Sequence, residues 1–216
     1  SQEEYSKILE NKQNPLLNRA LAAQMPPGST FKTIVAAAGL DSKAITKNTV
    51  YVSRAGYTFS NGAPFQEFRK HVYGSLTVVD ALAVSSNIFF CEMIRDWDMD
   101  ELVPYLERFG IGEYTNIDIP GEAKGRLPSP ENKIKLANTT SPWLEPVWYP
   151  EGDSCNSVIG QGITLVTPIQ MSNWMAAIAN GGTLYTPHVA KKLVDGNGLE
   201  YPLEFEILEE NIVSKS

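Results

Sequence analysis

The chain has 216 residues, of which 43% are hydrophobic, and its formal net charge at pH 7 is −7. This length and apolar content suit one substantial domain with a packed core. An acidic chain without a lysine- and arginine-rich cluster is a poor fit to a nucleic-acid partner. No apolar run approaches the ~20 residues that a membrane-spanning helix needs.

Residues 3–24 carry apolar side chains at near-helical spacing, interrupted at Asn14-Pro15. This pattern predicts a short helix, a turn and an irregular lead-in. Pro26-Pro27-Gly28 then forms a corner, because proline cannot continue a helix and glycine permits a sharp turn. A new helix is predicted to begin near Ser29 and to end around residues 39–40.

Ser29 and Lys32 lie one helical turn apart in this predicted helix. Residues three apart on a helix have Cβ atoms about 5–6 Å apart, so the lysine could take a proton from the serine hydroxyl. Lysine is protonated at pH 7 unless its pKa is lowered, and the apolar run after Lys32 offers burial that would lower it. The simpler interpretation is a helix-capping serine followed by a solvated lysine.

The middle of the chain alternates short strands and helices. Strand-forming residues at 49–68 predict short strands, with Asn61-Gly62 as a turn. Gly74-Ser75 is predicted to open a helix, with Ser75 as its N-cap and residues 76–84 as its apolar face. Helices are then expected from Ile88 to about residue 97, and over 99–109.

The polar stretch over residues 115–149 is predicted to be a long ordered loop. Its apolar residues are expected to be buried, namely Trp143, Leu144, Val147, Trp148 and Tyr149. Thr167, Pro168 and Gln170 make a complete helix-start signature, and this helix should end at residues 180–182. Residues 183–194 favour a strand pair or a strand plus an extension, and Asn197-Gly198 favours a hairpin turn.

The cysteines and histidines show no metal-ligand spacing. We expect Cys91 and Cys155 to be structural, and their pairing stays open. His71 and His188 are isolated from each other, so both are expected to be surface or packing residues.

In this order and spacing, the motifs closely resemble the transpeptidase domain of class B penicillin-binding proteins, in the penicilloyl-serine transferase superfamily. The resemblance covers nearly the whole chain. Its main motifs are Pro26-Pro27-Gly28-Ser29-Thr30-Phe31-Lys32, Ser85-Ser86-Asn87, Gly160-Gln161-Gly162 and Thr167-Pro168-Ile169-Gln170-Met171. Residues 14–20, 109–112, 117–122 and 180–182 support it, and residues 148–153 are more similar to the elongation-specific branch than to the division-specific one.

The resemblance implies a role for each residue of the candidate site. Ser29 would be the nucleophile that attacks the D-Ala–D-Ala carbonyl of a peptidoglycan stem peptide, and its N–H one of two oxyanion donors. Lys32 would be the general base. Ser85 would relay a proton between Lys32 and the departing D-alanine amine, and Asn87 would hold Lys32 and the substrate backbone. Without the upstream pair, Ser85 and Asn87 could simply cap the helix that starts at Ile88.

Four more residues are expected to bind substrate, namely Ser86, Gly160, Gln161 and Gly162. For the glycine-flanked triplet the alternative is a tight turn that packs beneath the site.

One element of the superfamily pattern is absent from the 216 residues, the Lys-Thr-Gly or Lys-Ser-Gly motif. Lys215-Ser216 fits it only superficially, because it follows residues 186–188 too closely. We therefore expect residues 1–216 to be a fragment of a transpeptidase domain, without the early strands and the Lys-Thr-Gly strand. The implied fold is α+β, mainly the helical part with an incomplete antiparallel sheet, and such a fragment is expected to be inactive alone.

The leading hypothesis is a D,D-transpeptidase that cross-links stem peptides from lipid-linked precursors and is the covalent target of β-lactams. The alternatives are a class D-like serine β-lactamase, which has Ser-x-Val where this chain has Ser85-x-Asn87, and a β-lactam sensor domain. The resemblance implies no cofactor or metal. It implies a membrane glycosyltransferase and the elongation complex as partners, and a place on the extracytoplasmic face of the inner (cytoplasmic) membrane with an anchor outside this chain.

Overall fold

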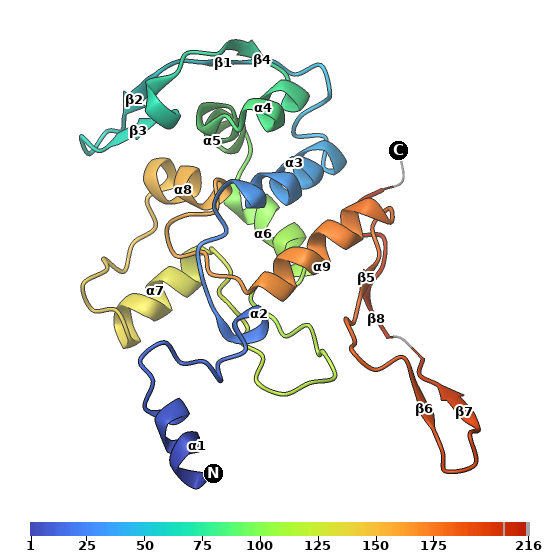
Figure 1. The fold of residues 1–216 in the computed structure, drawn as a ribbon. Coiled ribbons are helices and arrows are strands. Elements are labelled where there is room, and N and C mark those ends of the chain that lie inside the picture. The colour runs from blue at the N-terminus through green and yellow to red at the C-terminus, as the bar shows by residue number, and fades with distance from the viewer. Residues whose placement is uncertain (205, 215–216) are drawn as a thin grey trace.

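The computed structural model describes residues 1–204 and 206–214 of the chain (Figure 1). Its helices are α1 (Gln2–Leu9), α2 (Arg19–Ala22), α3 (Lys32–Asp41), α4 (Val78–Val84), α5 (Asn87–Asp96), α6 (Met99–Arg108), α7 (Pro130–Thr139), α8 (Cys155–Val158) and α9 (Pro168–Ala179). Helical turns of other types are the 3₁₀ turns η1 (Gly28–Phe31) and η2 (Phe68–Lys70) and the π turn η3 (Pro150–Ser154).

The strands are short and pair in twos. They are β1 (Tyr51–Ser53), β2 (Gly56–Thr58), β3 (Pro64–Gln66), β4 (Gly74–Leu76), β5 (Leu184–Tyr185), β6 (Lys192–Val194), β7 (Glu200–Pro202) and β8 (Ile207–Glu209). Within the described ranges the antiparallel pairs are β1–β4, β2–β3, β5–β8 and β6–β7. This mixture of helices and small sheets confirms the predicted α+β class.

Helix α3 lies at the centre of the helical body, where it contacts α4, α6 and α9 (Figure 1). Its sequence is rich in alanine and apolar on most sides, which is typical of a buried helix. Ile34, Val35 and Ala38 are fully buried. Lys32 is the first residue of this helix, so its side chain lies at the edge of the hydrophobic core.

Helix α9 begins as the sequence predicts. The Thr167 hydroxyl accepts from the Gln170 backbone N–H, the Gln170 side chain accepts from the Thr167 N–H, and Pro168 occupies the first helical position. Trp174 on this helix is fully buried and packs edge-on against Phe31, with ring centroids 5.9 Å apart. The helix thus supports the turn that precedes Lys32.

The predicted helix start at Gly74-Ser75 is wrong. Ser75 lies in β4, opposite Val52 of β1, and the N-cap of α4 is Thr77. Thr77 and Asp80 form a reciprocal capping box, which satisfies two N-terminal donors, whereas a lone serine two residues earlier satisfies one at most.

The predicted long loop over residues 115–149 contains helix α7. Ser129 caps it and Pro130 occupies its first position, a start signature like that at Thr167. The expected burial of the apolar residues that follow α7 is also wrong in part. Trp148 packs against the core, but Trp143 is 77% exposed.

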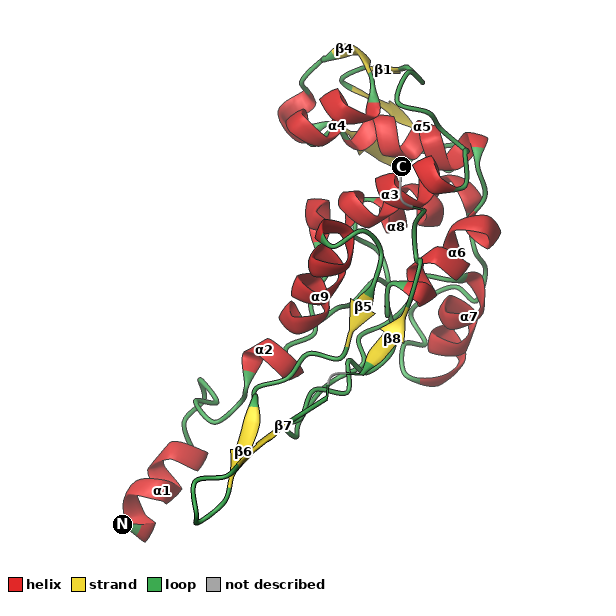
Figure 2. Cartoon of the chain, turned by 90° about the vertical axis from the view of Figure 1, so that its right-hand side faces the viewer, coloured by secondary structure: helices red, strands yellow, loops and turns green. Residues whose placement is uncertain are grey.

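Helix α1 and the β6–β7 hairpin extend from the same end of the helical body (Figure 2). None of the residues of α1, β6 or β7 is buried. The hairpin turn is at the predicted Asn197-Gly198, where the Asp195 carboxylate accepts from the Asn197 N–H. None of the helices in the described ranges has the length and apolar content needed to cross a membrane.

Candidate active site

Ser29 and Lys32 lie on one short turn at the entrance of α3. Ser29 belongs to the 3₁₀ turn η1 instead of starting an α-helix, and residues three apart in such a turn are nearly eclipsed. Gly28, which precedes it, has φ +58°. The Ser29 side chain is exposed, whereas Lys32 is only 1% exposed. The turn thus presents a hydroxyl to solvent above a buried amine.

The Lys32 ammonium contacts the corner between α4 and α5. Its Nζ lies 2.7 Å from the Ser85 carbonyl oxygen, 3.2 Å from Ser85 Oγ and 2.7 Å from Asn87 Oδ1. The Phe90 ring centroid lies 5.8 Å away. The structure therefore brings Lys32, Ser85 and Asn87 together from elements more than fifty residues apart. The described residues show no hydrogen bond between Ser29 Oγ and Lys32 Nζ, a contact that often tightens only when substrate binds.

Burial lowers the pKa of Lys32 to about 8, and the negative charge of Glu67 opposes part of that fall. The cause is desolvation, because an apolar environment disfavours the charged ammonium. With such a pKa about a tenth of the lysine is neutral at pH 7. Lys32 can therefore accept a proton near neutral pH, as the sequence led us to expect from the apolar run of α3.

The Ser85-Ser86-Asn87 corner has an unusual backbone. Ser85 adopts a left-handed conformation with φ 56° at the end of α4, which costs a non-glycine residue about 1–2 kcal/mol. This conformation turns both the carbonyl and the hydroxyl of Ser85 toward Lys32.

Ser86, which the sequence led us to place at the substrate, is fully buried on the other side of this corner. Its hydroxyl accepts from the Phe89 N–H at 3.0 Å and donates to Glu67. A buried side chain with both bonds made inside the protein cannot contact a substrate, so Ser86 acts as the N-cap of α5.

The Gly160-Gln161-Gly162 triplet packs against the Ser29 turn. The Gly160 carbonyl accepts from the Gly28 N–H at 2.9 Å. A Cβ at Gly160 would lie 2.3 Å from the Gly28 carbonyl oxygen, so only glycine permits this approach. Gln161 is exposed beside Ser29, whereas the exposed Gly162 is outside the cavity lining. Gly160 therefore has a packing role, and Gln161 remains available to a ligand.

A cavity of about 420 Å³ joins these parts. It is lined by Gly28, Ser29, Phe68, Tyr73, Val84, Ser85, Asn87, Ile159 and Gln161. Sequence reasoning missed the apolar lining from Phe68 and Tyr73. Both lie in or near the segment predicted to form strands. Because aromatic residues are common in strands, their presence there does not indicate a binding site.

A disulfide joins Cys91 of α5 to Cys155 of α8, which answers the question that the sequence left open. Asn87 lies at the start of α5, and Ile159, which also lines the cavity, directly follows α8. The disulfide therefore links two walls of the cavity covalently. The Tyr57 hydroxyl contacts the Cys91 sulfur beside it.

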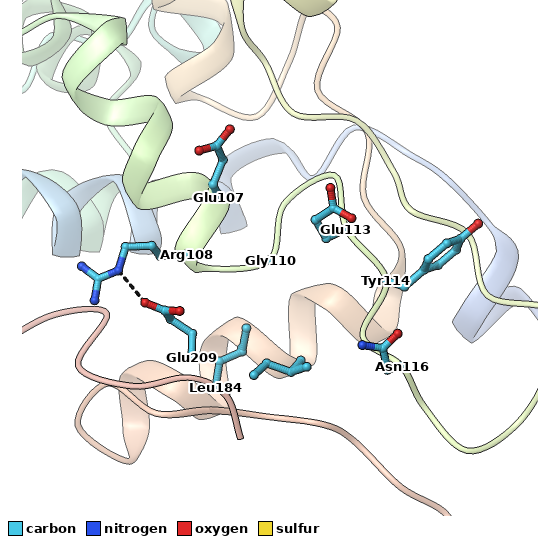
Figure 3. Close-up of a pocket in the computed structure, with 9 residues that line it drawn as sticks. Glu107, Arg108, Gly110, Glu113, Tyr114, Asn116, Leu184 and Glu209 are labelled. Atoms are coloured by element: carbon cyan, nitrogen blue, oxygen red, sulfur yellow. Dashed lines mark hydrogen bonds and ion pairs between the residues drawn. The ribbon is translucent and has the colours of Figure 1, made fainter. Parts of the chain in front are cut away.

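A second cavity, of about 290 Å³, lies between α6 and β8 (Figure 3). Arg108 there pairs with Glu209 at 2.9 Å and donates to the carbonyl oxygens of Ile212 and Glu210. Its guanidinium thus fixes residues 209–212 against α6. Over residues 1–204 and 206–214, no cluster of histidine, cysteine and acidic side chains could hold a metal ion.

Comparisons with known proteins agree with this geometry. The sequence profile of the family described as Penicillin binding protein transpeptidase domain matches residues 1–216. The peptidoglycan D,D-transpeptidase MrdA of Escherichia coli K12 is 33% identical over 190 residues, which are 88% of this chain and 29% of that protein. This chain thus spans about three tenths of the length of that curated relative.

Solved structures show the same fold. Pseudomonas aeruginosa PBP2, in complex with WCK 5153, superposes with a TM-score of 0.83 at 30% identity, over 100% of this chain and 46% of the other. Helicobacter pylori PBP2, in its complex with MreC, superposes with a TM-score of 0.78 at 30% identity, over 94% of this chain and 36% of the other. The chain belongs to the penicillin-binding protein transpeptidase domain family, on its elongation-type class B branch.

Proposed function

We propose that the protein carrying this chain is a peptidoglycan D,D-transpeptidase that forms an acyl-enzyme on Ser29. The observation that carries the proposal is the buried Lys32 amine, held by Ser85 and Asn87 beneath an exposed serine hydroxyl. An activated hydroxyl next to a base of lowered pKa is what nucleophilic acyl transfer requires.

Ser29 Oγ attacks the carbonyl carbon of the penultimate D-alanine, and Lys32 takes the hydroxyl proton. The tetrahedral oxyanion receives a hydrogen bond from the Ser29 N–H, which lies in the first turn of η1, where helical N–H groups lack partners. When the C–N bond breaks, the Lys32 proton passes through Ser85 Oγ to the departing D-alanine amine. The amine of a second stem peptide then attacks the acyl carbonyl carbon and gives up a proton, which passes through Lys32 to Ser29 Oγ as the C–O bond breaks. This forms the cross-link and restores the serine hydroxyl.

A β-lactam enters the same first step. Its ring amide takes the place of the D-Ala–D-Ala amide, so the C–N bond opens but the amine remains attached to the acyl group. The acyl-enzyme then persists. A β-lactamase would release it by hydrolysis within seconds, so the lifetime of the adduct separates the leading proposal from the class D-like alternative. A sensor domain would form the adduct without cross-linking stem peptides.

Several features belong to the whole protein. We propose that residues 1–216 alone do not catalyse, because the third motif would supply a second oxyanion donor, and loss of one donor costs about 10²–10³ in rate. Lys215-Ser216, the superficial match to that motif, lies outside the described residues.

We place the protein on the extracytoplasmic face of the cytoplasmic membrane, with lipid-linked precursors as substrates and a glycosyltransferase and the elongation complex as partners. The complex of Helicobacter pylori PBP2 with MreC supports such a partnership by analogy.

Treating the whole protein with a labelled penicillin and locating the adduct by mass spectrometry tests this function. The expected adduct is on Ser29. Ser29→Ala should abolish labelling, whereas Thr30→Ala, which removes the adjacent exposed hydroxyl, should preserve it. An adduct on another residue, or persistent labelling of Ser29→Ala, would contradict the proposal.

A further inference from the structure

Glu67 is a buried carboxylate directly behind the candidate site. It follows β3 in the chain and is only 3% exposed. A buried carboxylate is costly unless its oxygens are hydrogen-bonded. Its Oε1 accepts from Ser53 Oγ at 2.8 Å, from Ser86 Oγ and from the Ile88 N–H at 3.2 Å. Its Oε2 accepts from the Asn87 N–H at 2.6 Å.

Three of these donors belong to the start of α5. The N–H groups of Asn87 and Ile88 are in the first turn, where no intrahelical acceptor exists and negative charge is favoured. Ser86 is the N-cap of the same helix. Glu67, which directly follows β3 and lies twenty residues before Asn87, therefore binds the end of α5 that faces Lys32.

The residue before Glu67 fixes the Asn87 side chain. The Gln66 carbonyl oxygen accepts from Asn87 Nδ2 at 2.9 Å. With its amide nitrogen held there, Asn87 directs Oδ1 to Lys32 Nζ at 2.7 Å. Gln66 and Glu67 together thus hold both the backbone and the side chain of Asn87.

The same contacts determine the place of Ser85. Its left-handed conformation lies between α4 and the start of α5, so its carbonyl and hydroxyl reach Lys32 only while the first turn of α5 stays in place. Strained backbone of this kind persists where surrounding structure fixes it. Lys32, Gln66 and Glu67 all bond the corner from outside the two helices that it joins, and Glu67 is the one of the three that binds the backbone at the start of α5.

We propose that Glu67 is a positioning residue for acylation, whose carboxylate fixes the Ser85-Ser86-Asn87 corner so that Ser85 and Asn87 meet Lys32. The inference rests on the proposed acyl transfer at Ser29. Glu67 does not touch substrate, because Ser86 and the first turn of α5 lie between it and the cavity. It acts through the geometry of Ser85 and Asn87.

The test compares Glu67→Gln with Ser53→Ala in the whole protein. Glu67→Gln keeps the side-chain shape but places a donor or a weaker acceptor against the Asn87 N–H. Ser53→Ala removes a buried hydrogen bond to the same carboxylate without touching the corner, so it is the matched control. Rapid-mixing kinetics with a labelled penicillin separate the dissociation constant of the non-covalent complex from the limiting acylation rate, and thermal unfolding is measured alongside.

We expect Glu67→Gln to lower the limiting acylation rate by about 10–100-fold, because small misplacements of reacting groups have such effects. The dissociation constant of the non-covalent complex of Glu67→Gln should stay within about threefold of that of the unchanged protein. Ser53→Ala should lose about as much thermal stability as Glu67→Gln, but its acylation rate should change by less than about twofold. In an Asn87→Ala background, Glu67→Gln should lower the acylation rate by a smaller factor than in the unchanged protein, because the share of its effect that acts through the Asn87 side chain is already lost and only the share through Ser85 remains.

An acylation rate of Glu67→Gln within about twofold of that of the unchanged protein would overturn the inference. An equal loss of acylation rate in Ser53→Ala would also overturn it. So would a Glu67→Gln, Asn87→Ala double variant whose loss of rate equals the product of the two single losses. Should Glu67→Gln fail to fold, Glu67→Asp, which keeps the charge on a shorter side chain, takes its place under the same criteria. The unchanged protein distinguishes the two proposals. If it is not labelled on Ser29, the acyl-transfer function itself fails and this inference falls with it.

Discussion

Asn87 Oδ1 lies 2.7 Å from Lys32 Nζ, although 55 residues separate the two in the chain. In the proposed acyl transfer, this contact holds the amine in place while the amine exchanges its proton. A hydrogen bond of this kind favours the protonated lysine, so burial must outweigh it for the lysine to act as a base.

Removing the Asn87 amide should slow acylation. The amide positions the Lys32 amine, and small misplacements of reacting groups cost up to about 100-fold, so we expect Asn87→Ala to lower the limiting acylation rate by about 10–100-fold. Stopped-flow labelling with a fluorescent penicillin measures this rate. The control is Asn132→Ala, which removes a side-chain amide of α7 that donates to the Leu127 carbonyl oxygen, and it should leave acylation unchanged. Equal rates for both variants would contradict the assignment.

The pH dependence of acylation should follow Lys32. Because its pKa is lowered to about 8, the neutral, proton-accepting form is scarce below that pH and predominates above it. The acylation rate should therefore rise with pH to a plateau with a midpoint near 8. Glu67 raises this pKa, so Glu67→Gln should move the midpoint to lower pH, even though the rate on its plateau is reduced. Lys32→Arg, which stays protonated, should show no rise. A midpoint that Glu67→Gln does not move would contradict this electrostatic link.

Replacing Gly160 should disturb the Ser29 turn. A Cβ there would meet the Gly28 carbonyl oxygen at 2.3 Å, and φ is +70°. We expect Gly160→Ala to lower the free energy of unfolding by about 2–4 kcal/mol, from overpacking and backbone strain together. Gly62→Ala shares the positive φ but has open space around it, so it should cost only about 1–2 kcal/mol. Urea unfolding measures both changes, and a Gly160→Ala loss no larger than that of Gly62→Ala would show that the close approach is unimportant.

The disulfide between Cys91 and Cys155 should raise the free energy of unfolding, because it closes a loop between two residues 64 positions apart. Cross-links of this kind typically contribute about 2–4 kcal/mol, mainly by restricting the unfolded chain. Cys91→Ser with Cys155→Ser should lower the free energy of unfolding by that amount, as should reduction by a thiol. A reduced protein with unchanged stability would contradict this prediction.

Local signals in the sequence were the most informative. Thr167, Pro168 and Gln170 predict the start of α9 because a capping box and a first-turn proline act within four residues. The same logic fails at Ser75, because the stronger capping box begins at Thr77 and the preceding residues pair with β1. Helix α7 was missed for the opposite reason, since its start at Ser129-Pro130 lies within a stretch rich in loop-forming residues.

The candidate site was predictable where the chemistry needs a fixed spacing. Ser29 and Lys32 are defined by one helical turn, and Ser85 and Asn87 by their resemblance to a known motif. Glu67 had no such signal, because the role proposed for it depends on contacts with residues about twenty positions away. The burial of Ser86 likewise follows from the left-handed Ser85 before it, and that conformation is not readable from three small polar residues in a row.

The bond between Cys91 and Cys155 also sets a condition on where the protein matures. Thiols stay reduced in the cytosol, and lasting cross-links form in oxidising compartments. With the extracytoplasmic location proposed above, newly made chain would leave the ribosome with its two cysteines free. It would acquire the cross-link only after export, on the side of the membrane where cell wall is built.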